Sequence, residues 1–162
     1  MMRLSDEMIK LLSAQAVNEL YNSNVYASMA NNLDVLGYKN SASYMRNQSK
    51  EEREHFEKII EYLTNRNCKV ALDEVPVIQN EYIEVVEAFV DAQTLEFTTT
   101  EEWKKIYSLC IAECDWITKQ LAQEFMNIQY KEETEIMSIV DSISVMGGKP
   151  EFIMMWDNTY EF

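Results

Sequence analysis

Apolar residues recur at steps of three and four along most of the chain, which places them on one face of an α-helix. Ser5 can cap the first helix and Gly37 can end it, while Gly147, Gly148 and Pro150 end the last long one. Residues 81–146 contain no proline or glycine. One helix of that length is improbable in a compact domain, so we expect a break near Asp115. The pattern predicts helices over about 5–36, 40–65, 80–113, 115–146 and 151–158.

The connection over residues 66–80 is too long for a simple hairpin and contains Pro76. Fully extended, it can cover ~45 Å, about the length of a 30-residue helix. We therefore expect the second and third helices to be parallel. Residues 1–162 then form one all-α domain, a four-helix bundle with one long crossover and a short fifth helix.

All four predicted core-facing seams become polar at mid-length. The polar groups are Glu19, then Glu52 and His55, then Glu96, and finally Gln129 and Glu132. Within each helical pair these residues lie at similar distances from the connecting turn, to within about one helical turn. We expect the groups to share one layer of the bundle.

Four facing carboxylates would repel one another and take up protons unless cations intervened, so the layer indicates a metal centre. Glu52 and His55 are three residues apart and can reach one ion together. Oxygen-rich ligation with one imidazole suits iron better than a structural zinc site. The alternative is a bundle whose acids are only buried or bridged by water. Other seam polar residues, Gln15, Asn22, Gln48 and Gln93, read as packing or supporting groups.

Tyr26 lies seven residues after Glu19, two turns along the same face. It could hydrogen-bond a ligand or donate an electron. The alternative is an ordinary core tyrosine.

The composition favours a cation as the bound partner. The formal charge of −14 argues against nucleic acid or an anionic membrane as partner, because both need clustered Lys and Arg. Hydrophobic residues make up 47% of the chain, yet no apolar run approaches the ~18 residues that span a bilayer. Three cysteines and no signal segment fit a reducing, cytoplasmic location.

Taken together, these residues resemble the ferritin family, specifically the non-haem ferritins of bacteria and archaea. The resemblance covers nearly the whole chain and rests on Asn18, Glu19, Leu20, Tyr21 and Tyr26, on Glu51, Glu52, Glu54, His55, Tyr62 and Leu63, on Glu96, and on Gln129, Glu132, Glu133 and Gly147.

The resemblance implies a ferroxidase centre that oxidises Fe(II) with dioxygen or peroxide. Glu19, Glu52 and His55 would hold one iron, with Glu52 bridging, and Glu96 and Glu132 would hold the second. Gln129 would lie beside the second iron, and Tyr26 beside the centre. Such proteins store the ferric product as a mineral inside a shell of 24 subunits. The activity, iron storage and the homo-oligomer are thus expectations from the family.

Several features separate this chain from related families. Ile128 and Lys131 stand where many bacterial ferritins have glutamates of a third iron site, although Glu51 remains. The single histidine does not fit bacterioferritins and rubrerythrins, which use a second Glu-x-x-His. Arg53 occupies the place of the bacterioferritin haem-ligand methionine, so no haem is expected. Miniature ferritins place their ligands between subunits, whereas here all four helices of one chain contribute. The short closing helix is a departure from the family pattern, and it bears on the fourfold contacts of the shell.

Two other functions remain alternatives at this point. One is a di-iron oxidase or peroxidase that does not store iron. The other is a metal-free assembly protein.

Overall fold

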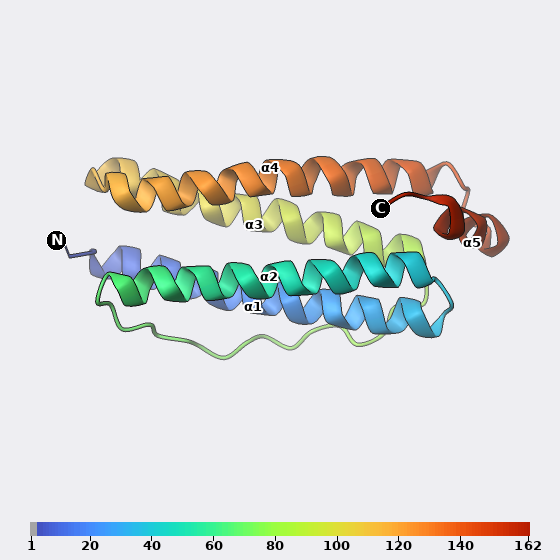
Figure 1. Ribbon diagram of the computed structural model, residues 1–162, viewed down its shortest axis with the longest axis horizontal. Coiled ribbons are helices and arrows are strands. Elements are labelled where there is room, and N and C mark those ends of the chain that lie inside the picture. Colours follow the sequence, from blue (N-terminus) through green and yellow to red (C-terminus); the bar gives the residue numbers. More distant parts are fainter. Residues whose placement is uncertain (1–2) are drawn as a thin grey trace.

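The computed structural model describes residues 3–162, and this part of the chain is helical, without strands (Figure 1). The five helices are α1 (Asp6–Val35), α2 (Lys39–Asn65), α3 (Val85–Glu113), α4 (Trp116–Ser144) and α5 (Pro150–Thr159). The predicted four-helix bundle with a short fifth helix is confirmed.

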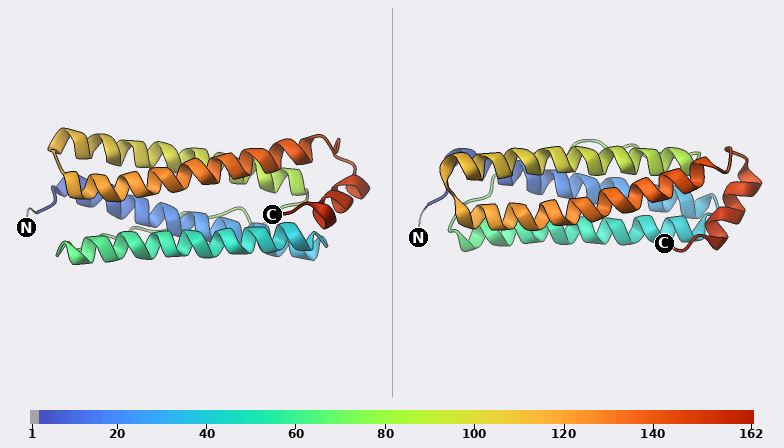
Figure 2. Two further views of the ribbon diagram at one scale, coloured as in Figure 1. Left: turned by 45° about the horizontal axis from the view of Figure 1, so that its top comes forward. Right: turned by 90° about the horizontal axis from the view of Figure 1, so that it is seen from above.

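The bundle consists of two antiparallel pairs, α1 with α2 and α3 with α4, packed side by side (Figure 2). The chain between α2 and α3 returns along the outside of α1, so α2 and α3 run in the same direction (Figure 1). Asn32 of α1 anchors this crossover: its amide group donates to the Asn80 carbonyl at 3.2 Å, and its side-chain oxygen accepts from the Tyr82 N–H at 3.2 Å. The crossover predicted from its length is present.

The third helix begins at Val85, later than the expected start near residue 80. Tyr82 is buried in the apolar core, and its backbone N–H is bonded to Asn32. These contacts keep the residues before Val85 extended, because a helix there would withdraw both groups from their partners. The predicted start was wrong because these contacts are tertiary, and the local sequence around residue 80 does not indicate them.

The break between α3 and α4 falls where the capping signal predicts it. Cys114 adopts a left-handed conformation with φ 55°, which ends α3. The Asp115 side chain then accepts from the Thr118 N–H at 3.0 Å and caps α4.

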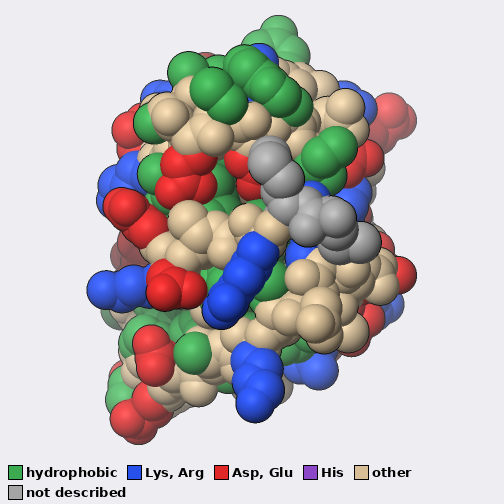
Figure 3. Space-filling model, turned by 90° about the vertical axis from the view of Figure 1, so that its left-hand side faces the viewer, with side chains coloured by type: hydrophobic (Ala, Val, Ile, Leu, Met, Phe, Trp, Pro, Cys, Tyr) green, Lys and Arg blue, Asp and Glu red, His purple; other side chains and the backbone are tan. Residues whose placement is uncertain are grey.

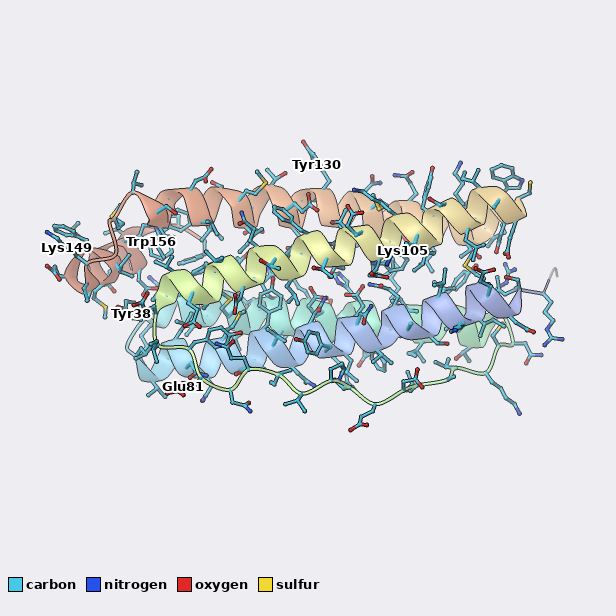
Figure 4. The ribbon with its side chains drawn as sticks, turned by 180° about the vertical axis from the view of Figure 1, so that it is seen from behind. Tyr38, Glu81, Lys105, Tyr130, Lys149 and Trp156 are labelled. Atoms are coloured by element: carbon cyan, nitrogen blue, oxygen red, sulfur yellow. The ribbon has the colours of Figure 1, made fainter. Side chains whose placement is uncertain are left out.

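Helix α5 is fastened to the first turn of α2. The buried Asp157 carboxylate accepts from the backbone N–H groups of Asn40 at 3.2 Å and Ser41 at 2.8 Å, and from the Ser41 hydroxyl. Trp156 lies where α5 joins the bundle, and its indole donates to the Ser142 hydroxyl at 3.0 Å (Figure 4). Asp157 therefore supplies the side-chain cap that α2 lacks at its own N-cap, Tyr38.

The core is divided into two apolar clusters. One extends from the middle of the bundle to the α5 end and includes Met29, Met45 and Phe89. The other fills the opposite end and includes Leu12 and Trp103. On each of the four long helices, buried polar side chains lie between the residues of the first cluster and those of the second. This arrangement leaves a polar layer at mid-length.

Candidate metal centre

Each long helix contributes at least one polar side chain to the layer. Glu19 comes from α1, Glu52 and His55 from α2, Glu96 from α3, and Gln129 and Glu132 from α4. Glu19, Glu52, Glu96 and Gln129 are buried, while His55 and Glu132 are partly buried.

Three of these side chains converge on one point. Ligand atoms of Glu19, Glu52 and His55 all lie within 4.8 Å of one another. The His55 Nδ1 atom is 3.5 Å from Glu52 Oε2 and 3.9 Å from Glu19 Oε2. These three atoms are buried and have no hydrogen-bond partner among the residues that the structure describes. Buried polar atoms left without partners cost free energy, so their convergence is the arrangement expected of a cation site.

Glu96 lies in a second group of side chains. Its Oε1 atom accepts a hydrogen bond from the Tyr26 hydroxyl, and its Oε2 atom accepts from Gln129 Nε2 at 3.1 Å. The same Gln129 amide donates to the Glu96 backbone carbonyl at 3.2 Å. Both carboxylate oxygens thus accept a hydrogen bond, and each keeps a further lone pair that a metal ion could use.

The carboxyl groups of the layer hold their protons strongly. Burial, and then repulsion by Glu52, raises the pKa of Glu19 well above its usual value. Burial raises the pKa of Glu52 to about 8, with repulsion from Glu96 and Glu132 adding to it. The pKa of Glu132 rises to about 7 through burial and repulsion from Glu96 and Glu51. Without cations the layer is therefore partly protonated at neutral pH, and a bound cation would displace those protons.

Tyr26 keeps its proton and acts as a donor. Burial, followed by repulsion from Glu96 and Glu52, raises the pKa of its hydroxyl well above the usual value. The resemblance to ferritins implies that Tyr26 lies beside the centre, and in the structure its hydroxyl donates a hydrogen bond to the Glu96 carboxylate.

The sequence-predicted ligands thus form two groups, one of Glu19, Glu52 and His55 and one of Glu96 and Gln129. Glu132 is linked to Glu96 and Glu52 by electrostatic repulsion. Metal ligation by these residues stays a prediction. At the expected third iron site, Glu51 and Lys131 are exposed and Ile128 is partly buried.

Two supporting contacts carry more than the sequence assigned to them. Gln15 Nε2 and Trp103 Nε1 both donate to Glu19 Oε1, at 2.8 Å and 3.1 Å. Gln15 was expected only to pack or support, and Trp103 was given no role although it lies on the α3 seam. A buried indole N–H needs an acceptor, and this requirement could have pointed to a carboxylate in the same layer.

A profile of the ferritin family, described as a ferritin-like domain, matches residues 9–146. The chain belongs to the ferritin family. A bacterial non-heme ferritin of Staphylococcus epidermidis is 27% identical over 154 residues, which cover 95% of this chain and 93% of the relative. A probable bacterial non-heme ferritin-like protein of Haemophilus influenzae is 26% identical over 153 residues, covering 93% of each chain.

Solved ferritin structures share the fold closely. An open pore ferritin of the archaeon Archaeoglobus fulgidus superposes with a TM-score of 0.91 at 26% identity, covering 96% of this chain and 94% of that one. Among residues 3–162, no helix is both long and apolar enough to span a membrane.

Proposed function

We propose that this ferritin-family protein oxidises Fe(II) at a di-iron ferroxidase centre within each chain and stores the ferric product in an oligomeric shell. The observation that carries the proposal is the convergence of three unpartnered buried atoms, Glu19 Oε2, Glu52 Oε2 and His55 Nδ1, within 4.8 Å. A cation would satisfy all three at once.

The donor set suits Fe(II) as the substrate ion. Two carboxylates and one imidazole provide mostly oxygen ligands. A structural zinc site, in contrast, is usually built from cysteine sulfur and histidine nitrogen. Glu52 is also repelled by Glu96 and Glu132, and we assign to it the position between two ions. Glu96 and Glu132 would hold the second ion, with Gln129 beside it.

Two Fe(II) ions can each give one electron, and the two electrons, with two protons, reduce dioxygen to hydrogen peroxide or hydrogen peroxide to water. The protein residues would bind and orient the ions, and their carboxylates would stabilise the positive charge that oxidation adds. Tyr26 donates its hydroxyl hydrogen to Glu96 and so fixes one carboxylate oxygen of the second group. The apolar clusters close the layer at both ends along the bundle axis.

Storage and assembly form the second half of the proposal. The bacterial relatives are named non-heme ferritins, and an acidic protein with a charge of −14 attracts Fe(II). Exposed apolar side chains gather at the α3–α4 turn, where Trp116 is 56% and Ile117 54% exposed (Figure 3). Such side chains favour contact with other subunits. We propose that residues 1–162 form one domain and that 24 such chains assemble into a shell in the cytoplasm.

The test adds tens of Fe(II) equivalents per chain to metal-free protein in air. Storage predicts oxidation that continues through all additions and leaves a ferric core in solution. The alternative, a di-iron oxidase or peroxidase that does not store iron, predicts that oxidation stops after about two equivalents per chain. Native mass or light scattering of the same sample checks the shell, since a dimer would contradict it.

A matched pair of variants separates the centre from the surface charge. Glu52→Gln keeps the size of the side chain and removes the proposed bridging carboxylate, so we expect rapid oxidation to be lost. Glu54→Gln removes the same charge from an exposed position on the same helix and should oxidise iron normally. Equal rates in both variants would contradict the proposed centre.

A further inference from the structure

The two oxygens of the Glu19 carboxylate have different surroundings. Oε1 accepts hydrogen bonds from Gln15 Nε2 at 2.8 Å and from Trp103 Nε1 at 3.1 Å. Oε2 has no donor among the described residues and lies 3.9 Å from His55 Nδ1. The donors thus hold one oxygen and leave the other facing the proposed metal position.

The Trp103 indole is itself held in place by its neighbours. It is fully buried and stacks on Phe125 of α4, with ring centroids 4.0 Å apart and planes 9° apart. Rotation of the indole would open this stack and leave its buried N–H without an acceptor, and both changes cost free energy. The direction of the N–H is therefore fixed by packing.

The same stack reaches a second side chain of the cluster. The Phe125 ring meets the His55 ring edge-on, with centroids 5.4 Å apart and planes at 81°. Trp103 thus contacts Glu19 directly and supports His55 through Phe125. The rings of Trp103 from α3, Phe125 from α4 and His55 from α2 thus contact one another in a row that ends at the proposed metal position.

We infer that Trp103 is a positioning residue for the metal centre, which holds Glu19 with Oε2 turned toward the ion and restrains His55 through Phe125. The inference rests on the proposed function and goes beyond it in assigning a role to a residue that binds no metal. Partners that orient metal ligands are commonly worth a factor of 10 to 100 in metal affinity. An indole bonded to a metal-binding carboxylate also lies close enough for a transition-metal ion to quench its fluorescence.

The main variant is Trp103→Phe, which keeps an aromatic ring for the stack on Phe125 and removes the indole N–H. Trp156→Phe is the matched control, since Trp156 is also buried and hydrogen-bonded but donates to Ser142 near α5. Co(II), which is stable in air, serves as the probe ion in place of Fe(II). Calorimetry gives its affinity and stoichiometry, and tryptophan emission is recorded through the same titration.

We expect Trp103→Phe to bind Co(II) about tenfold more weakly, while Trp156→Phe binds it as the wild type does. Co(II) should quench the emission of the wild type and of Trp156→Phe and leave the remaining emission of Trp103→Phe nearly unchanged. Gln15→Met removes the other donor to Oε1 without touching the stack and should also weaken binding. This second variant keeps the test usable if Trp103→Phe disturbs the core.

The outcomes are distinguishable. Unchanged Co(II) affinity in both Trp103→Phe and Gln15→Met would overturn the positioning role while leaving the metal centre intact. Binding by the wild type without any quenching would overturn the placement of Trp103 against a metal ligand. Absence of Co(II) binding by the wild type would overturn the proposed centre, and this inference with it.

Discussion

Removal of the charge at Glu52 should stabilise the metal-free protein. The buried Glu52 carboxyl has a pKa of about 8 in the folded chain, against the ordinary value of 4.5. Between these values the folded protein keeps a proton that the unfolded chain releases. The folded state thus binds more protons than the unfolded state, so the free energy of unfolding falls as pH rises from about 5 to about 8.

The size of the effect follows from the same two pKa values. One pKa unit corresponds to 1.36 kcal/mol, so raising the pH from 4.5 to 7 costs the folded state about 3 kcal/mol through this group. Glu52→Gln has no proton to lose and escapes this cost. For a chain of this length, about 3 kcal/mol corresponds to a melting temperature higher by about 6–12 °C.

The assay is thermal unfolding of metal-free protein at several pH values from about 5 to 8, with a chelator present. Wild type should lose stability across this range, and Glu52→Gln should lose about 3 kcal/mol less. Glu54→Gln, with the same change of charge at an exposed position, should follow the wild type. Parallel pH profiles for wild type and Glu52→Gln would refute the reasoning. Adding Co(II) should raise the melting temperature of the wild type more than that of Glu52→Gln, because only the wild type offers the full ligand set.

Two further predictions concern the parts that hold the bundle together. Asp157→Ala removes the carboxylate that caps α2 from α5 and should lower the free energy of unfolding by about 2 kcal/mol, measured by calorimetry; a loss no larger than that of Asp141→Ala, at an exposed site on α4, would contradict the capping role. Asn32→Ala frees the crossover from α1 and should cost about 1 kcal/mol while making residues 66–84 the first site of protease cleavage, with Co(II) affinity unchanged. Cleavage at the wild-type rate would show that other contacts hold the crossover.

The long helices could be predicted because their signals are local. Apolar spacing and the Asp115 cap each act within a few residues. The start of α3 could not, because it depends on Tyr82 reaching Asn32, which lies 50 residues away in sequence. The Asp157 cap of α2 escaped prediction for the same reason, since its partners are separated by more than one hundred residues.

The candidate site shows the same division. Periodicity puts Glu19, Glu52 and Glu96 on the core-facing side of their helices, the distances to the connecting turns indicate a common level, and three-residue spacing brings His55 beside Glu52. Periodicity does not indicate which oxygen of a carboxylate will accept a hydrogen bond from a given donor. The contact of Trp103 with Glu19 joins α3 to α1 and follows from the docking of two helical pairs. Such contacts depend on side-chain rotation and packing, which no spacing rule contains.

The two antiparallel pairs of the bundle divide the proposed ligands between them. Glu19, Glu52 and His55 all belong to the α1–α2 hairpin, while Glu96, Gln129 and Glu132 belong to the α3–α4 hairpin. One hairpin thus carries all the proposed ligands of the first ion, and the proposed second ion position requires the other hairpin to be docked in register. A slip of one hairpin by a helical turn, ~5.4 Å, would keep Glu19, Glu52 and His55 on one hairpin but abolish the pair of ion positions and break the contact of Trp103 with Glu19. Exchanging the α3–α4 hairpin would therefore redesign the second ion's surroundings and keep the proposed ligands of the first ion, as long as the new hairpin retained Trp103 and Phe125 beside Glu19 and His55.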